Sequence, residues 1–356
     1  EIVFRRQYLW DALSPFWGPI DIFSREETLP IKFNAFKKKA SHLLTGNFQT
    51  HSFHKSAQAF QLKSQQAEHY IHQLPEKPDL IFHLHGLWCP FWNASDIPYV
   101  MLLDYTMQLA IGNWSAWAPF TSQKEQDAWL ACERRAYQRA HHLFPMSQVV
   151  KSSLVNHYGV DPNKITVVGS AGNFQRPYHG EKQFGSKRIL FNGSDFTRKG
   201  GETVLAAFQY VKQQIPDATL VVVGRELVQL EDGIENPGSV SIAKVRGLLQ
   251  NADLVLAPAR CEPFGLFLVE AMNYGVPCIV SPVGGMPEIV EHNVSGIVLE
   301  TVSPQELAAQ IILLLSQPDR LEAMSVQARR AVATRFNWDS IAEKMVHALA
   351  QPALSC

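Results

Sequence analysis

Two acidic residues in the second half of this 356-residue chain are the first candidates for chemistry. Glu262 and Glu270 enclose a mostly apolar segment, and the apolar run 253–258, which ends in Pro, precedes them. That run predicts a buried parallel strand, and residues 266–274 predict a helix. Glu262 should therefore lie on a loop at the carboxyl end of a strand, where open α/β sheets bind ligands, and Glu270 about one turn into the helix.

Carboxylates held in this way can bind the hydroxyls of a sugar. Gly265 has no Cβ, so a phosphate could approach the first backbone N–H groups of the helix, whose dipole favours an anion. An isolated Glu is more often a solvated surface residue. The apolar neighbours of Glu270 favour the functional interpretation, because a carboxylate among them needs polar partners.

A pair of cations follows another predicted strand. Residues 188–193 are predicted to form a strand and the start of a loop, and Arg198 and Lys199 stand just before the helix predicted over 201–214. Arg198 offers a planar fork of donors and Lys199 a compact charge, so both could hold a diphosphate. Taken alone, such a pair is usually a solvated turn.

Strands and helices alternate along most of the chain, which predicts an α/β fold built from parallel βαβ units. The first half is predicted to contain strands at 80–85, 99–103, 142–146 and 164–168 and helices at 122–140 and 147–156. The second half is predicted to contain strands at 188–193, 218–224, 253–258 and 277–282 and helices at 201–214, 242–250, 266–274, from Ser303 and at 338–350. Gly172 is the predicted hinge between the halves.

Bulk properties exclude several classes of protein. The length suits two domains, and 32 Lys+Arg against 33 Asp+Glu give no case for nucleic acid as a partner. No apolar run reaches the roughly 20 residues of a transmembrane helix, and no signal peptide is recognisable, although the chain begins at Glu1. The five Cys form no CxxC pair, so a reducing cytoplasm is the expected location. The chain also contains no Asp-x-Asp pair, so no metal site is expected.

The amino-terminal half is rich in aromatic residues. All Trp residues except Trp338 precede residue 130, and they either line a sugar site or pack in the core. Residues 31–44 put apolar side chains on one helical face beside a Lys cluster. That helix could make weak peripheral contact with an anionic membrane surface, at the inner membrane face. The alternative, which we favour, is that it packs on its own domain.

Three motifs of the second half, taken together, resemble the donor half of glycosyltransferase family 4. They are Arg198-Lys199-Gly200, Glu262-Pro263-Phe264-Gly265-Leu266 with Glu270, and Gly284-Gly285 followed by Pro287-Glu288-Ile289-Val290. The resemblance covers about residues 165–345. It implies the GT-B fold, with two Rossmann-like domains and parallel sheets that face each other across a cleft. The domains would be an acceptor-binding 1–172 and a donor-binding 173–335, with a terminal helix at 336–356 that packs back towards the first.

The resemblance also implies roles for individual residues. Glu262 would bind hydroxyls of the transferred sugar, Glu270 the ribose, and Arg198 and Lys199 the diphosphate. The donor-binding set is Gly193, Phe264, Gly265, Leu266 and Glu270. A nucleoside diphosphate sugar would be the co-substrate, with a UDP-sugar ahead of GDP-mannose, and neither a cofactor nor an obligatory metal would be needed.

This chain departs from the family pattern in two places. Ser194 stands where many members carry an Arg, and we expect Arg198 to substitute for it. The Gly-rich loop near the start is not recognisable, since Gly18 is a poor candidate. On the acceptor side, His85 or Asp104 could orient the acceptor hydroxyl or accept its proton, and a structural role for either is the alternative.

The expected function is that of a retaining, metal-independent glycosyltransferase. It would move a hexose to a hydroxyl of a glycan, a glycolipid precursor or a small molecule. One alternative is a nucleotide-sugar epimerase of the same fold. Another is a non-catalytic sugar-binding partner subunit.

Overall fold

The computed structural model describes residues 7–17, 55–229 and 231–350. Within them the chain forms two compact units. The first contains the residues up to 143 together with 153–165, and the second contains 144–152 together with the residues from 166 onward. The boundary expected at residue 172 falls inside the second unit. The expected helix at 31–44 and Gly18 lie outside the described residues.

The first unit contains β1, β2 and the first two residues of β3, and these strands form a three-stranded sheet in the order β1-β2-β3. The strands are β1 (Ile81–Leu84), β2 (Tyr99–Leu103) and β3 (His142–Pro145). Its helices are α2 (Gln7–Trp17), α5 (Ala57–His72), α6 (Met107–Asn113), α7 (Gln123–Arg139) and α8 (Gln148–Asn156), which begins in the second unit, with short 3-10 turns at Ser115–Trp117 and Pro162–Lys164. β1 and β2 pair in parallel, so their carboxyl ends lie at the same edge. Every residue of β2 and β3 is buried, as their apolar sequences require.

The strand predicted over residues 164–168 is wrong. Residues 164–168 form no strand: Ile165 makes an isolated bridge to Leu143, and the Val168 N–H donates to the Pro145 carbonyl at 3.1 Å. Lys164 belongs to the 3-10 turn, because the Asp161 side chain accepts from the Asn163 N–H and starts that turn.

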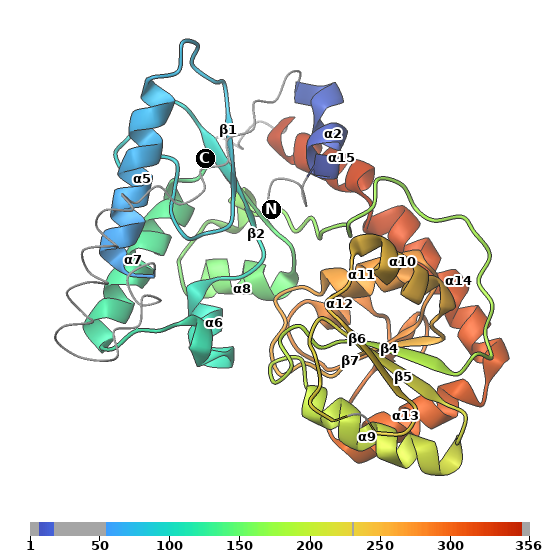
Figure 1. Ribbon diagram of the computed structural model, residues 1–356. Coiled ribbons are helices and arrows are strands. Elements are labelled where there is room, and N and C mark those ends of the chain that lie inside the picture. The colour runs from blue at the N-terminus through green and yellow to red at the C-terminus, as the bar shows by residue number, and fades with distance from the viewer. Residues whose placement is uncertain (1–6, 18–54, 230, 351–356) are drawn as a thin grey trace. The chain divides into compact units, whose positions relative to one another are not determined.

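The second unit contains a six-stranded parallel sheet in the order β6-β5-β4-β7-β8-β9. Its strands are β4 (Arg188–Asn192), β5 (Thr219–Val223), β6 (Ile234–Gly238), β7 (Leu254–Ala257), β8 (Cys278–Val280) and β9 (Gly296–Val298). Its helices are α9 (Gly201–Gln214), α10 (Ile242–Asn251), α11 (Leu266–Asn273), α12 (Met286–Ile289), α13 (Pro304–Leu315), α14 (Pro318–Arg335) and α15 (Trp338–Ala350). Figure 1 shows α9 and α13 on one face of this sheet and α10, α11 and α12 on the other.

This strand order is that of a doubly wound Rossmann-like sheet. The chain fills one side through β5 and β6, then returns past β4 to build β7, β8 and β9 on the other side. β4 and β7 are therefore the strands between which the topology switches, and ligands of such sheets bind beyond the carboxyl ends of these strands. α9 buries Val204, Phe208 and Val211 in the core against the sheet. The spacing of these residues is that of one helical face.

Most of the predicted elements are confirmed, and the structure adds several that the sequence analysis did not predict, among them α2, α5, α6, β6, β9 and α14. β6 reads Ile-Glu-Asn-Pro-Gly and β9 has only three residues, so neither shows a strand period. α14 is polar over much of its length, so its few buried residues do not give a clear helical period in the sequence. The capped start of α13 is confirmed, since the Ser303 hydroxyl accepts from the Glu306 N–H at 3.2 Å. Within the described ranges, no helix has the length and apolar character needed to cross a bilayer.

Candidate active site

The loops that follow β4 and β7 pack directly on each other. The Gly193 N–H donates to the Val223 carbonyl at 2.8 Å, which holds the end of β4 beside β5. A Cβ at Gly200 would lie 2.2 Å from the Pro258 carbonyl oxygen, so the turn that carries Arg198 and Lys199 rests on the end of β7. The two sequence motifs thus meet at the switch between β4 and β7.

Arg198 joins these two loops. Its side chain is only 10% exposed, and its Nε donates to Asp195 Oδ2 at 2.6 Å. Its Nη1 donates to the Cys261 carbonyl at 2.6 Å and to Glu262 Oε2 at 3.1 Å. Such charge-assisted bonds to a planar fork fix direction as well as distance. Arg198 therefore sets the orientation of the Glu262 carboxylate.

Lys199 differs from its neighbour in what it contacts. Among the described residues no hydrogen bond or ion pair to the Lys199 ammonium is present, whereas Arg198 is held by two carboxylates. Burial lowers the pKa of Lys199, and the negative charge of Glu262 opposes that effect. The ammonium keeps its donors for a ligand, so Lys199 is the better candidate for a phosphate contact.

The loop after β7 places Glu262 and the start of α11. Gly265 is the N-cap of α11 with φ of 110°, a conformation that L side chains rarely adopt, and no side chain caps this end. Phe264 is buried and packs edge-on against Phe336, with ring centroids 6.3 Å apart, whereas Leu266 is 36% exposed. The backbone N–H groups at the start of α11 can therefore receive an anion.

Gly284 and Gly285 pack against the loop that carries Glu262. Gly284 has φ of 57°, and a Cβ there would lie 1.7 Å from the Glu262 carbonyl oxygen. The Gly285 N–H donates to the Pro263 carbonyl at 3.0 Å. The Gly-Gly turn thus supports the backbone that carries Glu262, and only residues without a side chain fit at this contact.

Glu270 lies against the segment that was expected to be a hinge. Its Oε1 accepts from the Asn173 N–H at 3.0 Å, and a Cβ at Gly172 would lie 2.6 Å from its Cγ. The close contact at Gly172 gives this glycine a packing role. Glu270 is half-buried, and its negative charge acts on Lys199.

The first unit brings together the two residues considered for the acceptor side. His85 follows β1 and Asp104 follows β2, and His85 Nδ1 lies 3.2 Å from Asp104 Oδ1. Their side chains are 29% and 39% exposed. His85 has φ of 66°, which is uncommon for a residue other than Gly, and such strain clusters at functional sites. A carboxylate on one ring nitrogen fixes which tautomer the imidazole presents.

The candidate residues thus fall into two groups. One group lies at the carboxyl edge of the second sheet and contains Gly193, Arg198, Lys199, Glu262, Phe264, Gly265, Leu266 and Glu270. The other is the pair His85 and Asp104 in the first unit. Sequence reasoning missed Asp195, which holds Arg198. The signal was present, because an acid three residues before an Arg in a turn can reach its guanidinium.

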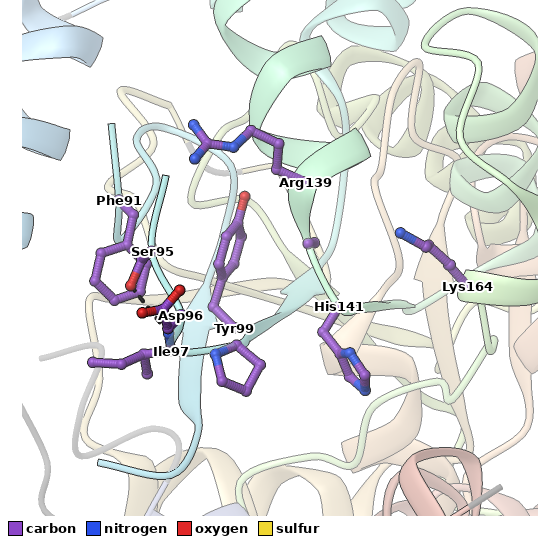
Figure 2. A pocket seen from close by; sticks show the side chains of 10 residues that line it. Phe91, Ser95, Asp96, Ile97, Tyr99, Arg139, His141 and Lys164 are labelled. Atoms are coloured by element: carbon purple, nitrogen blue, oxygen red, sulfur yellow. Dashed lines mark hydrogen bonds between the residues drawn. The ribbon is translucent and has the colours of Figure 1, made fainter. Parts of the chain in front are cut away.

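A cavity of about 290 Å³ in the first unit belongs to neither group. It lies at the amino ends of β2 and β3, and Figure 2 shows that the side chains of Arg139, His141 and Lys164 point in different directions along its wall. Arg139 already donates to the carbonyls of Trp92 and Asn93. The cavity therefore lacks a convergent set of polar groups.

Two family models match the chain. Residues 177–331 match glycosyl transferases group 1, and residues 24–171 match glycosyltransferase family 4. Together the matches span most of the chain. It belongs to this group of glycosyltransferases and has the GT-B fold, with two Rossmann-like domains.

Known proteins agree with this assignment. A D-inositol 3-phosphate glycosyltransferase from Segniliparus rotundus is 30% identical over 56% of this chain and 50% of the relative. A GDP-mannose-dependent alpha-(1-6)-phosphatidylinositol monomannoside mannosyltransferase from Mycobacterium tuberculosis is 30% identical over 42% of this chain and 43% of the relative. The chain thus spans about half the length of these curated relatives. The structure of Anabaena HepE in complex with UDP and glucose has a TM-score of 0.63 at 17% identity, and the match covers 98% of this chain and 96% of that chain.

Proposed function

We propose that this protein is a retaining, metal-independent glycosyltransferase that moves a hexose from a nucleoside diphosphate sugar to an acceptor hydroxyl. The observation that carries the proposal is the placement of Lys199 and Glu262 on the loops that flank the switch between β4 and β7. A cation with free donors and an oriented carboxylate at this place fit a diphosphate and a sugar.

Each donor-side group has a distinct task in this proposal. Lys199 and the N–H groups at the start of α11 stabilise the negative charge that grows on the departing diphosphate. Glu262, oriented by Arg198, accepts hydrogen bonds from sugar hydroxyls, and Glu270 accepts from the ribose. Because positive groups of the protein offset the charge, and the sequence has no Asp-x-Asp pair, the reaction needs no divalent cation.

The bond changes follow from retention. The bond between the anomeric carbon and the phosphate oxygen breaks, and the acceptor oxygen forms its new bond on the same face. The acceptor proton passes to the departing phosphate, while the His85–Asp104 pair orients the acceptor hydroxyl. The acceptor is a hydroxyl of a glycan, a glycolipid precursor or a small molecule.

A UDP-sugar is the favoured donor and GDP-mannose the second. HepE, which shares the fold, was solved with UDP and glucose, whereas one relative is named for its dependence on GDP-mannose. Binding of either donor class to the native state would raise the melting temperature with ligand concentration. A thermal-shift screen across UDP, GDP and their sugars therefore separates the two.

The direct test is release of nucleotide from each nucleotide sugar, with EDTA present and with a panel of sugar acceptors. We expect turnover that survives EDTA. Lys199→Ala should lower kcat/KM by roughly tenfold to hundredfold, since a charged hydrogen bond contributes about 1.5–3 kcal/mol. Lys187→Ala is the matched control, because Lys187 pairs with the exposed Asp217 at 2.7 Å. Equal turnover by both variants, or turnover only with added metal, would contradict the proposal.

A further inference from the structure

A buried carboxylate in the first unit connects the segments that follow β1 and β2. Glu133 of α7 is only 3% exposed. Both of its oxygens lie 3.3 Å from the Met107 N–H at the start of α6. The hydroxyl of Tyr137 donates to Glu133 Oε1 at 3.1 Å, and the hydroxyl of Tyr158 donates to its Oε2. Three donors thus converge on one side chain.

The partners of Glu133 touch both strand ends that carry the acceptor-side pair. A Cβ at Gly86 would lie 2.3 Å from the Tyr137 hydroxyl oxygen, so this tyrosine packs directly on the residue that follows His85. Met107 begins the helix that follows the Asp104 loop, and the Gln108 N–H donates to the Tyr158 hydroxyl at 3.1 Å. Displacing the Glu133 carboxylate would therefore disturb both segments at once.

The three donors need an acceptor, but for fold stability that acceptor need not be charged. Burial raises the pKa of Glu133 to about 7, in spite of the hydrogen bonds from Tyr158, Tyr137 and Met107. The start of α6 already has a cap, because the Thr106 hydroxyl accepts from the Leu109 N–H at 3.3 Å. A buried charged group is weak evidence for a gain in stability, since apolar residues of similar volume often serve as well or better.

We propose that Glu133 is a positioning residue, which holds the segments after β1 and β2 so that His85 and Asp104 meet at 3.2 Å. Glu133 does not touch substrate; it acts through the pair. This inference rests on the proposed function, in which the pair orients the acceptor hydroxyl. Misplacing an orienting group by a fraction of an ångström should lower the rate of transfer without changing how the donor binds.

The test compares Glu133→Gln with a matched control, Glu68→Gln. Glu68 is a second buried acid of the same unit, 8% exposed, and it accepts from the Asn93 N–H and side-chain amide at 3.2 and 3.1 Å. Tyr137→Phe is the milder variant, which removes one hydroxyl from the network and keeps the ring. For each protein, kcat of acceptor transfer, donor KM and hydrolysis of the donor without acceptor are measured.

We expect Glu133→Gln and Tyr137→Phe to lower kcat of transfer by roughly tenfold or more, with donor KM and hydrolysis within about twofold of wild type. Glu68→Gln should leave all three within about twofold. In an Asp104→Asn background, Glu133→Gln should add little further loss, because the two changes act on the same pair. Equal loss of transfer and hydrolysis, or fully additive losses, would overturn the inference.

A measurement on the ring of His85 separates this inference from the proposed function. The ring ¹⁵N chemical shifts of His85, assigned with a His85→Gln variant, report the hydrogen bond at Nδ1 without any turnover. Glu133→Gln should move these shifts and Glu68→Gln should not. If wild type fails to transfer sugar while the His85 shifts respond in this way, the proposed function fails and the positioning role stands. Unchanged shifts in Glu133→Gln would refute the positioning role.

Discussion

Replacing Arg198 with Met removes the contact between the two loops of the candidate donor site. Met fills a similar volume but donates no hydrogen bond. The Cys261 carbonyl, in a residue 1% exposed, loses a charged donor, which costs about 2 kcal/mol. Glu262 is 21% exposed and Asp195 45% exposed, so water compensates part of their loss, and together they add about 1 kcal/mol. The expected destabilisation is about 3 kcal/mol.

Arg188→Met is the control for this prediction. Arg188 makes two short bonds to Glu235, at 3.0 and 2.6 Å, but the side chains are 30% and 52% exposed. Such an exposed ion pair contributes about 0–1 kcal/mol. The assay is urea unfolding of the full chain. The urea concentrations at the unfolding midpoint are compared between variants whose m-values are the same. Equal shifts in the two variants, or a shift below about 0.5 kcal/mol for Arg198→Met, would refute the reasoning.

Three further predictions concern other parts of the structure. Gly284→Ala should destabilise the chain by about 2 kcal/mol or more in the same urea assay, because its Cβ would meet the Glu262 carbonyl at 1.7 Å, and wild-type stability would contradict this contact. Gly172→Ala should raise the donor KM in steady-state kinetics, since its Cβ would displace Glu270 from a position 2.6 Å away; an unchanged KM would remove Glu270 from the donor site. The pKa of His83 is lowered to about 3, mainly by burial and to a smaller extent by His85. As the pH falls, the unfolded chain therefore binds a proton at this residue before the folded chain does. Stability should therefore fall by up to about 1.4 kcal/mol per pH unit as pH drops from 6.5 towards 3, and a His83→Leu variant with the same slope in pH-dependent urea unfolding would contradict this.

The sequence predicts the second sheet well because its strands are short apolar runs with clear ends. β7 and the start of α11 follow from Asp253–Pro258 and Gly265, and the match with the structure places Glu262 where a ligand edge was expected. β6 could not be found in this way, since it contains a Pro and one buried apolar residue. Its pairing with β5 supplies what the local pattern lacks.

The contacts within the site depend on topology that a linear pattern does not contain. His85 and Asp104 were considered as alternatives, and they form a pair because β1 and β2 are parallel neighbours in register. The family resemblance predicted Arg198 as a diphosphate ligand. Its bond to Asp195 is local and could be predicted from the spacing of the two residues, whereas its bonds to Cys261 and Glu262 could not, since they need the turn after β4 to rest on the end of β7.

Calorimetric titration of UDP and of GDP into wild type, Lys199→Ala and Lys187→Ala tests most directly whether a nucleoside diphosphate binds beyond the carboxyl ends of β4 and β7. Binding should be measurable in wild type and in the Lys187 variant, with Kd values within about twofold of each other. Lys199→Ala should weaken binding by roughly tenfold to hundredfold, the equivalent of about 1.5–3 kcal/mol for a charged hydrogen bond. Equal affinity in all three proteins would place the nucleotide elsewhere. If no affinity for UDP or GDP is found in wild type, the central claim is wrong.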